Sequence, residues 1–245
     1  MKQRMKINRR EMLAGLAVGG CGLQEREQAG IDPSLHIPKA HLVEDRKLLH
    51  DFMDQYPFVD LVTSSPTLRI THLPVVLNRT AGSYGRIFGH ISRQNPQSQA
   101  FDGRHPGVVV FRGPHGYISP TWFAKTDVVP TWNFAVVHAS GRPKAITEKK
   151  ELHDMLARLI DTFEKYRGSA YDFSKLPESD VSSLIEGIVG FEMQVESLAG
   201  KFKLGQSWSE GDKQGVLEHL RQEAQRQPSL YDLSMSFYRR ASSRP

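Results

Sequence analysis

The chain has 245 residues, of which 39% are apolar and 24% charged, an ordinary globular composition that suffices to bury one sizeable core. No apolar run reaches the length of about eighteen residues that a conventional membrane-spanning helix requires. The net charge of +5 does not indicate nucleic-acid binding. Residues 1–20 contain five basic residues and one acidic residue, and their +4 leaves only +1 for residues 21–245.

The first 34 residues are predicted to be an export signal and a tether rather than part of the fold. Arg9 and Arg10 precede a short apolar stretch, which resembles a twin-arginine signal. Val18 to Cys21 resembles a lipobox, in which a lipidated cysteine would attach the mature protein to a membrane. We therefore expect an exported, periplasmic protein. The alternative is a cytoplasmic protein with a disordered basic tail or a mis-assigned start codon, because Glu11 interrupts the pattern.

The body of the chain begins with a helix and continues with several strands. Apolar residues recur at helical spacing between Val43 and Tyr56, and Pro57 ends the pattern. Most of the strand candidates that follow are bounded by Gly, Pro, Asn or Ser, and their spacing predicts an antiparallel meander or barrel rather than βαβ units. They are Phe58–Thr63, Arg69–Leu77, Arg86–Ser92, Val108–Phe111 with Tyr117–Ser119, and Trp132–His138.

Helices are predicted to pack on this barrel. Residues 152–163 carry the clearest amphipathic pattern in the chain. A short helix over Val181–Ile188 leads into a half-buried final strand, Val189–Val195, and a last helix is expected around Leu217. The prediction is a mainly β fold with packed helices (α+β). Residues 35–245 would form one domain with a helical extension at its C-terminal end.

One strand candidate contains a proline. Thr71, His72, Leu73 and Pro74 follow one another in a strand pattern, and Pro74 cannot donate a hydrogen bond to a neighbouring strand. The pattern therefore predicts an edge strand, a bulge or a place where the ladder opens.

The segment from Gly89 to Gln97 has the composition of a phosphate site. Ser92, Arg93 and Asn95 end a strand with a hydroxyl, a guanidinium and an amide, which are donors suited to a phosphate dianion. The alternative is that Arg93 and Asn95 simply solvate a surface loop.

Two aromatic turns could flank a planar ring. Trp122 and Trp132 lie beside small polar residues, among them Ser119 and Asn133, which could hydrogen-bond the polar edge of such a ring. The alternative is an aromatic corner of the core.

These segments occur in the order and spacing of the PaiB family, which the chain resembles from about His36 to about Leu220. The resemblance implies an FMN-binding split β-barrel, related in fold to pyridoxamine-phosphate oxidases and flavin reductases and usually dimeric, with the flavin at the subunit interface. The family is also labelled a negative transcriptional regulator. The shared segments are His36–Pro38, Thr71–Pro74, Gly89–Gln97, Gly113–Trp122, Val129–Phe134, Gly187–Glu192 and Gly200–Leu204.

The same resemblance implies where FMN would bind. The phosphate is expected near the end of one strand, and the isoalloxazine ring is expected between a second strand and the aromatic turns. The phosphate residues are His90, Ser92, Arg93 and Asn95, and the ring residues are Thr71, His72, Ser119, Trp122, Trp132 and Asn133. The chain departs from the family at Gly205–Ser207, where Ser-Gln-Asn is usual, and at Ser98, where an aromatic residue is usual.

Three functions remain open on the sequence. Regulation through DNA rests on the family label, because no helix-turn-helix, zinc finger or basic helix is recognised, and an exported protein could not reach the chromosome. A flavin-dependent oxidoreductase, supplied by a nicotinamide cofactor, would use FMN for the chemistry. Haem handling is the third function. Histidines are candidate proton donors, with hydrogen-bonded structural histidines as the alternative; they are His72, His90, His115 and His138.

Overall fold

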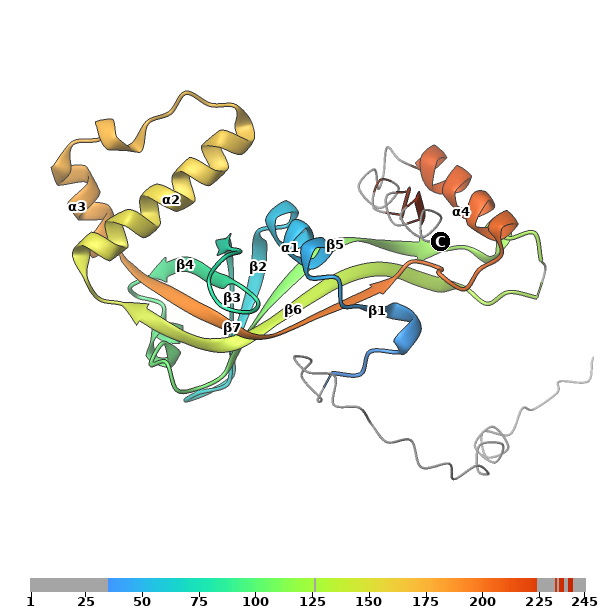
Figure 1. Cartoon of the computed structure of the whole chain (residues 1–245), viewed down its shortest axis with the longest axis horizontal. Coiled ribbons are helices and arrows are strands. Elements are labelled where there is room, and N and C mark those ends of the chain that lie inside the picture. Colours follow the sequence, from blue (N-terminus) through green and yellow to red (C-terminus); the bar gives the residue numbers. More distant parts are fainter. Residues whose placement is uncertain (1–34, 126, 224–231, 233, 236–237, 240–245) are drawn as a thin grey trace, which may run out of the picture.

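The computed structural model describes residues 35–125 and 127–223, together with residues 232, 234–235 and 238–239. Its centre is an antiparallel sheet with the strand order β1-β7-β4-β3-β2-β5-β6, in which β6 also pairs with β7. This extra pairing closes six strands into a barrel, as the family resemblance implied, and β1 adds to β7 outside it (Figure 1). The strands are β1 (Leu42–Val43), β2 (Phe58–Thr63), β3 (Arg69–Asn78), β4 (Arg86–Ser92), β5 (Gly107–Ile118), β6 (Thr131–Ile146) and β7 (Ile188–Lys203).

The α-helices lie around the barrel in three places. One lies against the barrel, two form a lobe at one end of the molecule, and the last lies at the opposite end beside the extended strands β5 and β6 (Figure 1). None of the described helices has the length and apolar character needed to cross a membrane. In this order the helices are α1 (Arg46–Gln55), α2 (Lys149–Arg167), α3 (Glu178–Glu186) and α4 (Glu210–Gln222).

The barrel interior is filled by side chains that alternate inwards along each strand. Leu61 of β2, Val109 of β5 and Val137 of β6 are fully buried, and Phe52 of α1 joins the same core. Burial of such a side chain stabilises the fold by about 1.5–3 kcal/mol. A second cluster, which includes Leu152 of α2, forms beneath α2 and α3. These apolar contacts hold both layers against the barrel wall.

Three of the predicted strands are longer in the structure. Val108–Phe111 and Tyr117–Ile118 belong to one strand, β5, because an irregularity between Arg112 and His115 lets the pairing with β6 continue, and Ser119 lies just outside it. The predicted strand Trp132–His138 extends to Thr131–Ile146 as β6. The final strand runs on past Val195 to Lys203, since β6 pairs with it over nearly its whole length. Alternation of side chains over short windows could not predict strands of this length.

The proline in β3 does not mark an edge strand, because β3 lies between β2 and β4. Residues 69–74 of β3 pair with β2, and residues 75–78 pair with β4. Pro74 is therefore the last residue paired with β2, at the point where β3 changes its partner. The missing donor is tolerated there because the ladder is interrupted in any case.

Candidate functional site

Buried amide groups join β3 to the 3-10 helix η3 (Pro96–Ala100). The side chain of Gln97 is fully buried, and its Nε2 donates to the carbonyl of Leu61 at 2.9 Å and to Thr63 Oγ1 at 3.2 Å. Thr71 donates its hydroxyl hydrogen to Gln97 Oε1, and Asn95 Nδ2 donates to Thr71 Oγ1 at 2.9 Å. The structure thus brings together Thr71 and Asn95, two of the predicted cofactor residues, by a direct hydrogen bond beside a buried glutamine.

A carboxylate, an imidazole and a guanidinium meet on the outer face of the barrel. Asp60 of β2 pairs in register with His72 of β3, and His72 Nδ1 lies 2.5 Å from Asp60 Oδ1. Arg112 of β5 donates from Nη2 to the other carboxylate oxygen. We call Asp60, His72 and Arg112 the outer-face triad.

The triad combines a shielded anion with two accessible partners. The carboxylate of Asp60 is largely buried, whereas the side chains of His72 and Arg112 are each 62% exposed. Burial alone would raise the pKa of Asp60, but hydrogen bonds from Arg112 and His72 outweigh it and hold that pKa below its usual value. Asp60 therefore stays ionised and orients two groups that face outwards.

The side chains of the predicted phosphate residues do not all point into a common site. Arg93 donates from Nε to the carbonyl of Glu186 at 2.5 Å and from Nη2 to the carbonyl of Ile185 at 3.4 Å. These carbonyls end α3, so Arg93 compensates the negative end of that helix. Ser92 Oγ accepts from the backbone of Gln94 at 3.3 Å. His90 is half-buried, and burial lowers its pKa. The phosphate role of these residues stays a prediction.

The other predicted ring residues lie on an arm. Beyond Phe111 the strands β5 and β6 leave β2 and continue as a hairpin, residues 113–134, which we call the arm (Figure 1). At about 3.3 Å per residue, Ile118 lies roughly 23 Å beyond Phe111. The arm thus carries its aromatic residues away from β3.

Three of the arm residues contact one another or α4. Trp132 Nε1 donates to His115 Nδ1 at 3.2 Å, and Trp122 stacks on His219 of α4 with ring centroids 5.3 Å apart. Ser119 Oγ accepts from the backbone of Thr121, where it caps the 3-10 helix η4 (Pro120–Trp122). These contacts order the arm side chains within the chain and leave their role towards a flavin ring a prediction.

Asn133 is fully buried in β6. Neither its Oδ1 nor its Nδ2 has a hydrogen-bond partner among the described residues. Buried amide groups are nearly always satisfied, so this side chain is a candidate to bind a polar group from outside the described chain.

Sequence reasoning did not single out Asp60, Gln97, Arg112 or Arg69 as site residues. Asp60 and Arg112 each interrupt an apolar strand pattern, and a charge in such a run is a usable signal. No local signal shows that they share a partner, since 52 positions separate them along the chain.

The residues near β3 fit an anionic cofactor. Arg69 starts β3, and its Nη1 is buried with no hydrogen-bond partner in the described part of the chain. A buried guanidinium donor of this kind can be satisfied by a phosphate oxygen. Arg69 and Asn95 therefore offer donors for a phosphate, on the face of β3 opposite to His72 and Arg112.

Comparison with known proteins gives the family. The family model described as "Putative FMN-binding domain" matches residues 35–197. The "Protease synthase and sporulation protein PAI 2" of Bacillus subtilis (strain 168) is 35% identical over 190 residues, which cover 77% of this chain and 90% of that protein.

Solved structures agree on the fold. The flavocytochrome Anf3 of Azotobacter vinelandii matches with a TM-score of 0.53 at 13% identity, covering 71% of this chain and 75% of that one. The FAD and heme binding protein of Mycobacterium smegmatis matches with a TM-score of 0.51 at 14% identity, covering 73% and 80%. The chain belongs to the FMN-binding family that includes PaiB, and it is an FMN-binding split-barrel protein.

Proposed function

We propose that this protein is a flavin-dependent oxidoreductase in which FMN binds beside the outer-face triad. The observation that carries the proposal is a pair of exposed side chains, the imidazole of His72 and the guanidinium of Arg112, anchored on the ionised carboxylate of Asp60. The triad differs from exposed ion pairs such as Lys47–Asp51 in its carboxylate, because the side chain of Asp60 is only 12% exposed and that of Asp51 is 32% exposed. The arrangement suits a site where positive charge must be held beside a bound molecule.

Each residue near β3 has a distinct part in this proposal. FMN, when bound, supplies hydride or electron transfer. Arg112 would hold a fixed positive charge beside the ring, where negative charge develops on reduction. His72 donates Nδ1–H to Asp60, which leaves Nε2 as the atom able to accept or release a proton. Arg69 and Asn95 would bind the phosphate, and the ligand would then pass round the start of β3, because successive residues of a strand face opposite sides.

The site would be completed by a second copy of the chain. Phe58 and Ile70, on the same outer face as His72, are 65% and 56% exposed, and an apolar surface of this kind favours association. Trp132 and Tyr117 on the arm are also about half exposed. We propose a homodimer in which these surfaces enclose the flavin, with a nicotinamide cofactor as the electron donor.

The test is an absorbance titration with two matched variants. Purified protein should take up added FMN and show flavin bands between about 350 and 500 nm, and these bands should bleach with NADH or NADPH under anaerobic conditions. Arg112→Gln should slow bleaching about tenfold, which corresponds to the loss of about 1.4 kcal/mol of charge stabilisation. Arg142→Gln is the control, because Arg142 is also an exposed strand arginine paired with a carboxylate, Glu196.

Two results would contradict the proposal. A protein that binds FMN but never bleaches with a range of reductants is not an oxidoreductase of this type. Equal bleaching rates for Arg112→Gln and Arg142→Gln would show that the triad takes no part in the reaction.

The other functions and locations that the sequence suggests stay predictions. Export and lipidation concern residues 1–34, including Cys21, which lie outside the described residues. DNA binding draws no support from α2, whose exposed face mixes Lys149 and Lys150 with Asp154 and Asp161 rather than forming a continuous basic surface. Two structural neighbours carry haem by name, the flavocytochrome Anf3 and the FAD and heme binding protein of Mycobacterium smegmatis, and they share only the fold at 13% and 14% identity.

A further inference from the structure

A cavity of about 690 Å³ opens between the barrel wall and α2, away from the triad. One side is formed by Val75, Val76 and Leu77 of β3, and the other by residues of α2. These β3 residues pair with β4, whereas His72 pairs with β2, so the cavity lies along the other half of the strand. Its volume is in the range of small-molecule sites.

The cavity has an apolar wall. Val75 and Val76 are buried, and Phe163 of α2 lines the opposite side together with Pro57. These side chains would contact the hydrocarbon or aromatic part of a ligand.

The opening is positively charged. Arg158, Lys165 and Arg167 of α2 line the cavity, and within the described chain no carboxylate lies within 4 Å of their charged groups. Lys165 and Arg167 also complement the negative end of α2, but Arg158 lies well before the last turn of the helix. The charge of Arg158 is therefore not explained by the helix end.

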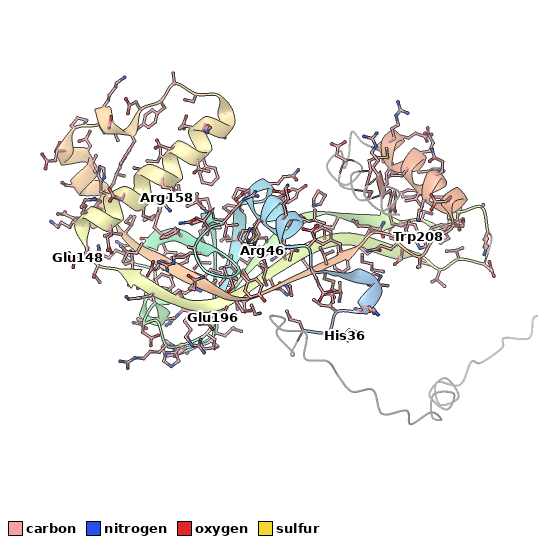
Figure 2. The ribbon with its side chains drawn as sticks, viewed as in Figure 1. His36, Arg46, Glu148, Arg158, Glu196 and Trp208 are labelled. Atoms are coloured by element: carbon pink, nitrogen blue, oxygen red, sulfur yellow. The ribbon has the colours of Figure 1, made fainter. Side chains whose placement is uncertain are left out.

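Arg158 is positioned by the barrel. Its guanidinium carbon lies 5.2 Å from the centroid of the Phe88 ring in β4. Figure 2 shows Arg158 on the side of α2 that faces the barrel. An aromatic contact of this kind restrains the side chain while leaving its hydrogen-bond donors available.

Two acidic residues nearby, Asp54 and Asp154, are engaged by other cations. Asp54, the carboxylate that lines the cavity, accepts from Arg79 Nε at 2.7 Å. Asp154 and Asp161 line a neighbouring hollow on α2, and Asp154 is bound by Lys150 at 2.6 Å. The three cations of the cavity thus exceed the carboxylates that face it.

We propose that this cavity binds a small amphipathic anion, with its apolar body against Val76 and Phe163 and its anionic head, a carboxylate or a phosphate ester, between Arg158 and Lys165. The site is separate from the proposed flavin site and does not depend on it.

A pair of fluorescent probes tests the inference on the full chain. The probe 1-anilinonaphthalene-8-sulfonate carries an aromatic body and an anionic head, and N-phenyl-1-naphthylamine has the same body without the charge. The anionic probe should bind saturably, and the double variant Arg158→Gln/Lys165→Gln should weaken it about tenfold or more. The neutral probe should change less than about twofold, because only the charged contact is lost.

Two further variants separate the cavity from other surfaces. Arg221→Gln, an exposed arginine on α4 at the opposite end of the molecule, should leave both probes unaffected (Figure 1). Thr162→Trp, at an exposed position of α2 that lines the cavity, should block both probes while circular dichroism stays unchanged. Octanoate and octyl phosphate then distinguish a carboxylate from a phosphate ester as the anionic head. The compound that displaces the anionic probe identifies the chemical class of the ligand.

Three outcomes would overturn the inference. The first is an unchanged affinity for the anionic probe in the double variant, and the second is a bound probe that neither octanoate nor octyl phosphate displaces. The third is a loss of probe binding as the protein dimerises, which would assign the cavity to a subunit contact. FMN uptake, measured in parallel by absorbance, should be the same in every variant, so that failure here is distinct from failure of the proposed flavin site.

Discussion

In the barrel, the polar side chains near β3 bond to one another across strands, whereas on the arm the aromatic side chains lie on a two-stranded hairpin. Asp60 is almost fully buried and holds His72 and Arg112, while Trp132 remains 46% exposed with a single described hydrogen bond, to His115. The barrel residues are positioned by their own chain. On the arm, Trp132 and Tyr117 each leave about half of their surface exposed.

The two regions therefore contribute differently to a binding site. A cross-strand network keeps its geometry in the isolated chain, because each member is restrained by at least one other. A surface aromatic gains most of its contact area only when a second surface covers it. This difference supports the proposed homodimer, in which one half of the site is preorganised and the other is completed by association.

The largest expected effect comes from adding one methyl group to the barrel and, for comparison, one to the helix beside the arm. A Cβ at Gly141 in β6 would lie 2.2 Å from the backbone carbonyl oxygen of Gln194 in β7, so Gly141→Ala should cost about 2–3 kcal/mol of unfolding free energy. Gly211→Ala in α4 has no atom within 4 Å of the new Cβ and should stabilise slightly, by about 0.5 kcal/mol. Urea unfolding of both variants measures the two changes in unfolding free energy. Equal changes would show that β6 and β7 can move apart at Gly141 without a loss of stability.

A medium effect is expected from Asp60→Asn, which removes the charge at the centre of the triad. The cost should be about 1 kcal/mol, because His72 and Arg112 remain exposed enough for water to screen them. The folded-state pKa of Asp60 lies below its usual 3.8, so its stabilisation is complete above about pH 4 and is lost as the pH falls through the folded pKa.

Unfolding curves of the wild type and Asp60→Asn between pH 2 and pH 7 check this sign. The difference in unfolding free energy should shrink towards zero at the acidic end. A difference that stays constant over this range would mean that the lost contribution is packing rather than charge.

The smallest effect on stability is expected on the arm. Trp132→Ala should change the unfolding free energy of the chain by less than about 0.5 kcal/mol, because the side chain is half exposed. The same variant should weaken FMN binding and dimer formation, measured by absorbance and by light scattering. Trp132→Ala and Arg112→Gln proteins can also be mixed. If each site combines the triad of one chain with the arm of its partner, the mixture should recover part of the activity. No recovery would mean that Trp132 and Arg112 of the same chain serve one site.

Much of the architecture was accessible from the sequence. Alternating apolar residues predicted β2 and β4 with the bounds that the structure has, and helical spacing predicted α1 and α2 to within a few residues at each end. These patterns are local, and burial of one face of a strand or helix is enough to produce them. The ordered motifs also identified the family.

The sequence by itself determined most of the strand and helix succession, because these patterns are encoded in neighbouring residues, and its ordered motifs gave the family, which implied the split barrel and the cofactor. Only the tertiary structure decided that Asp60 and Arg112 share a contact, that Arg93 binds the end of α3, and that Arg158 overlooks a cavity. Strand pairing in a closed barrel joins residues that are distant along the chain, and register fixes which of them face each other.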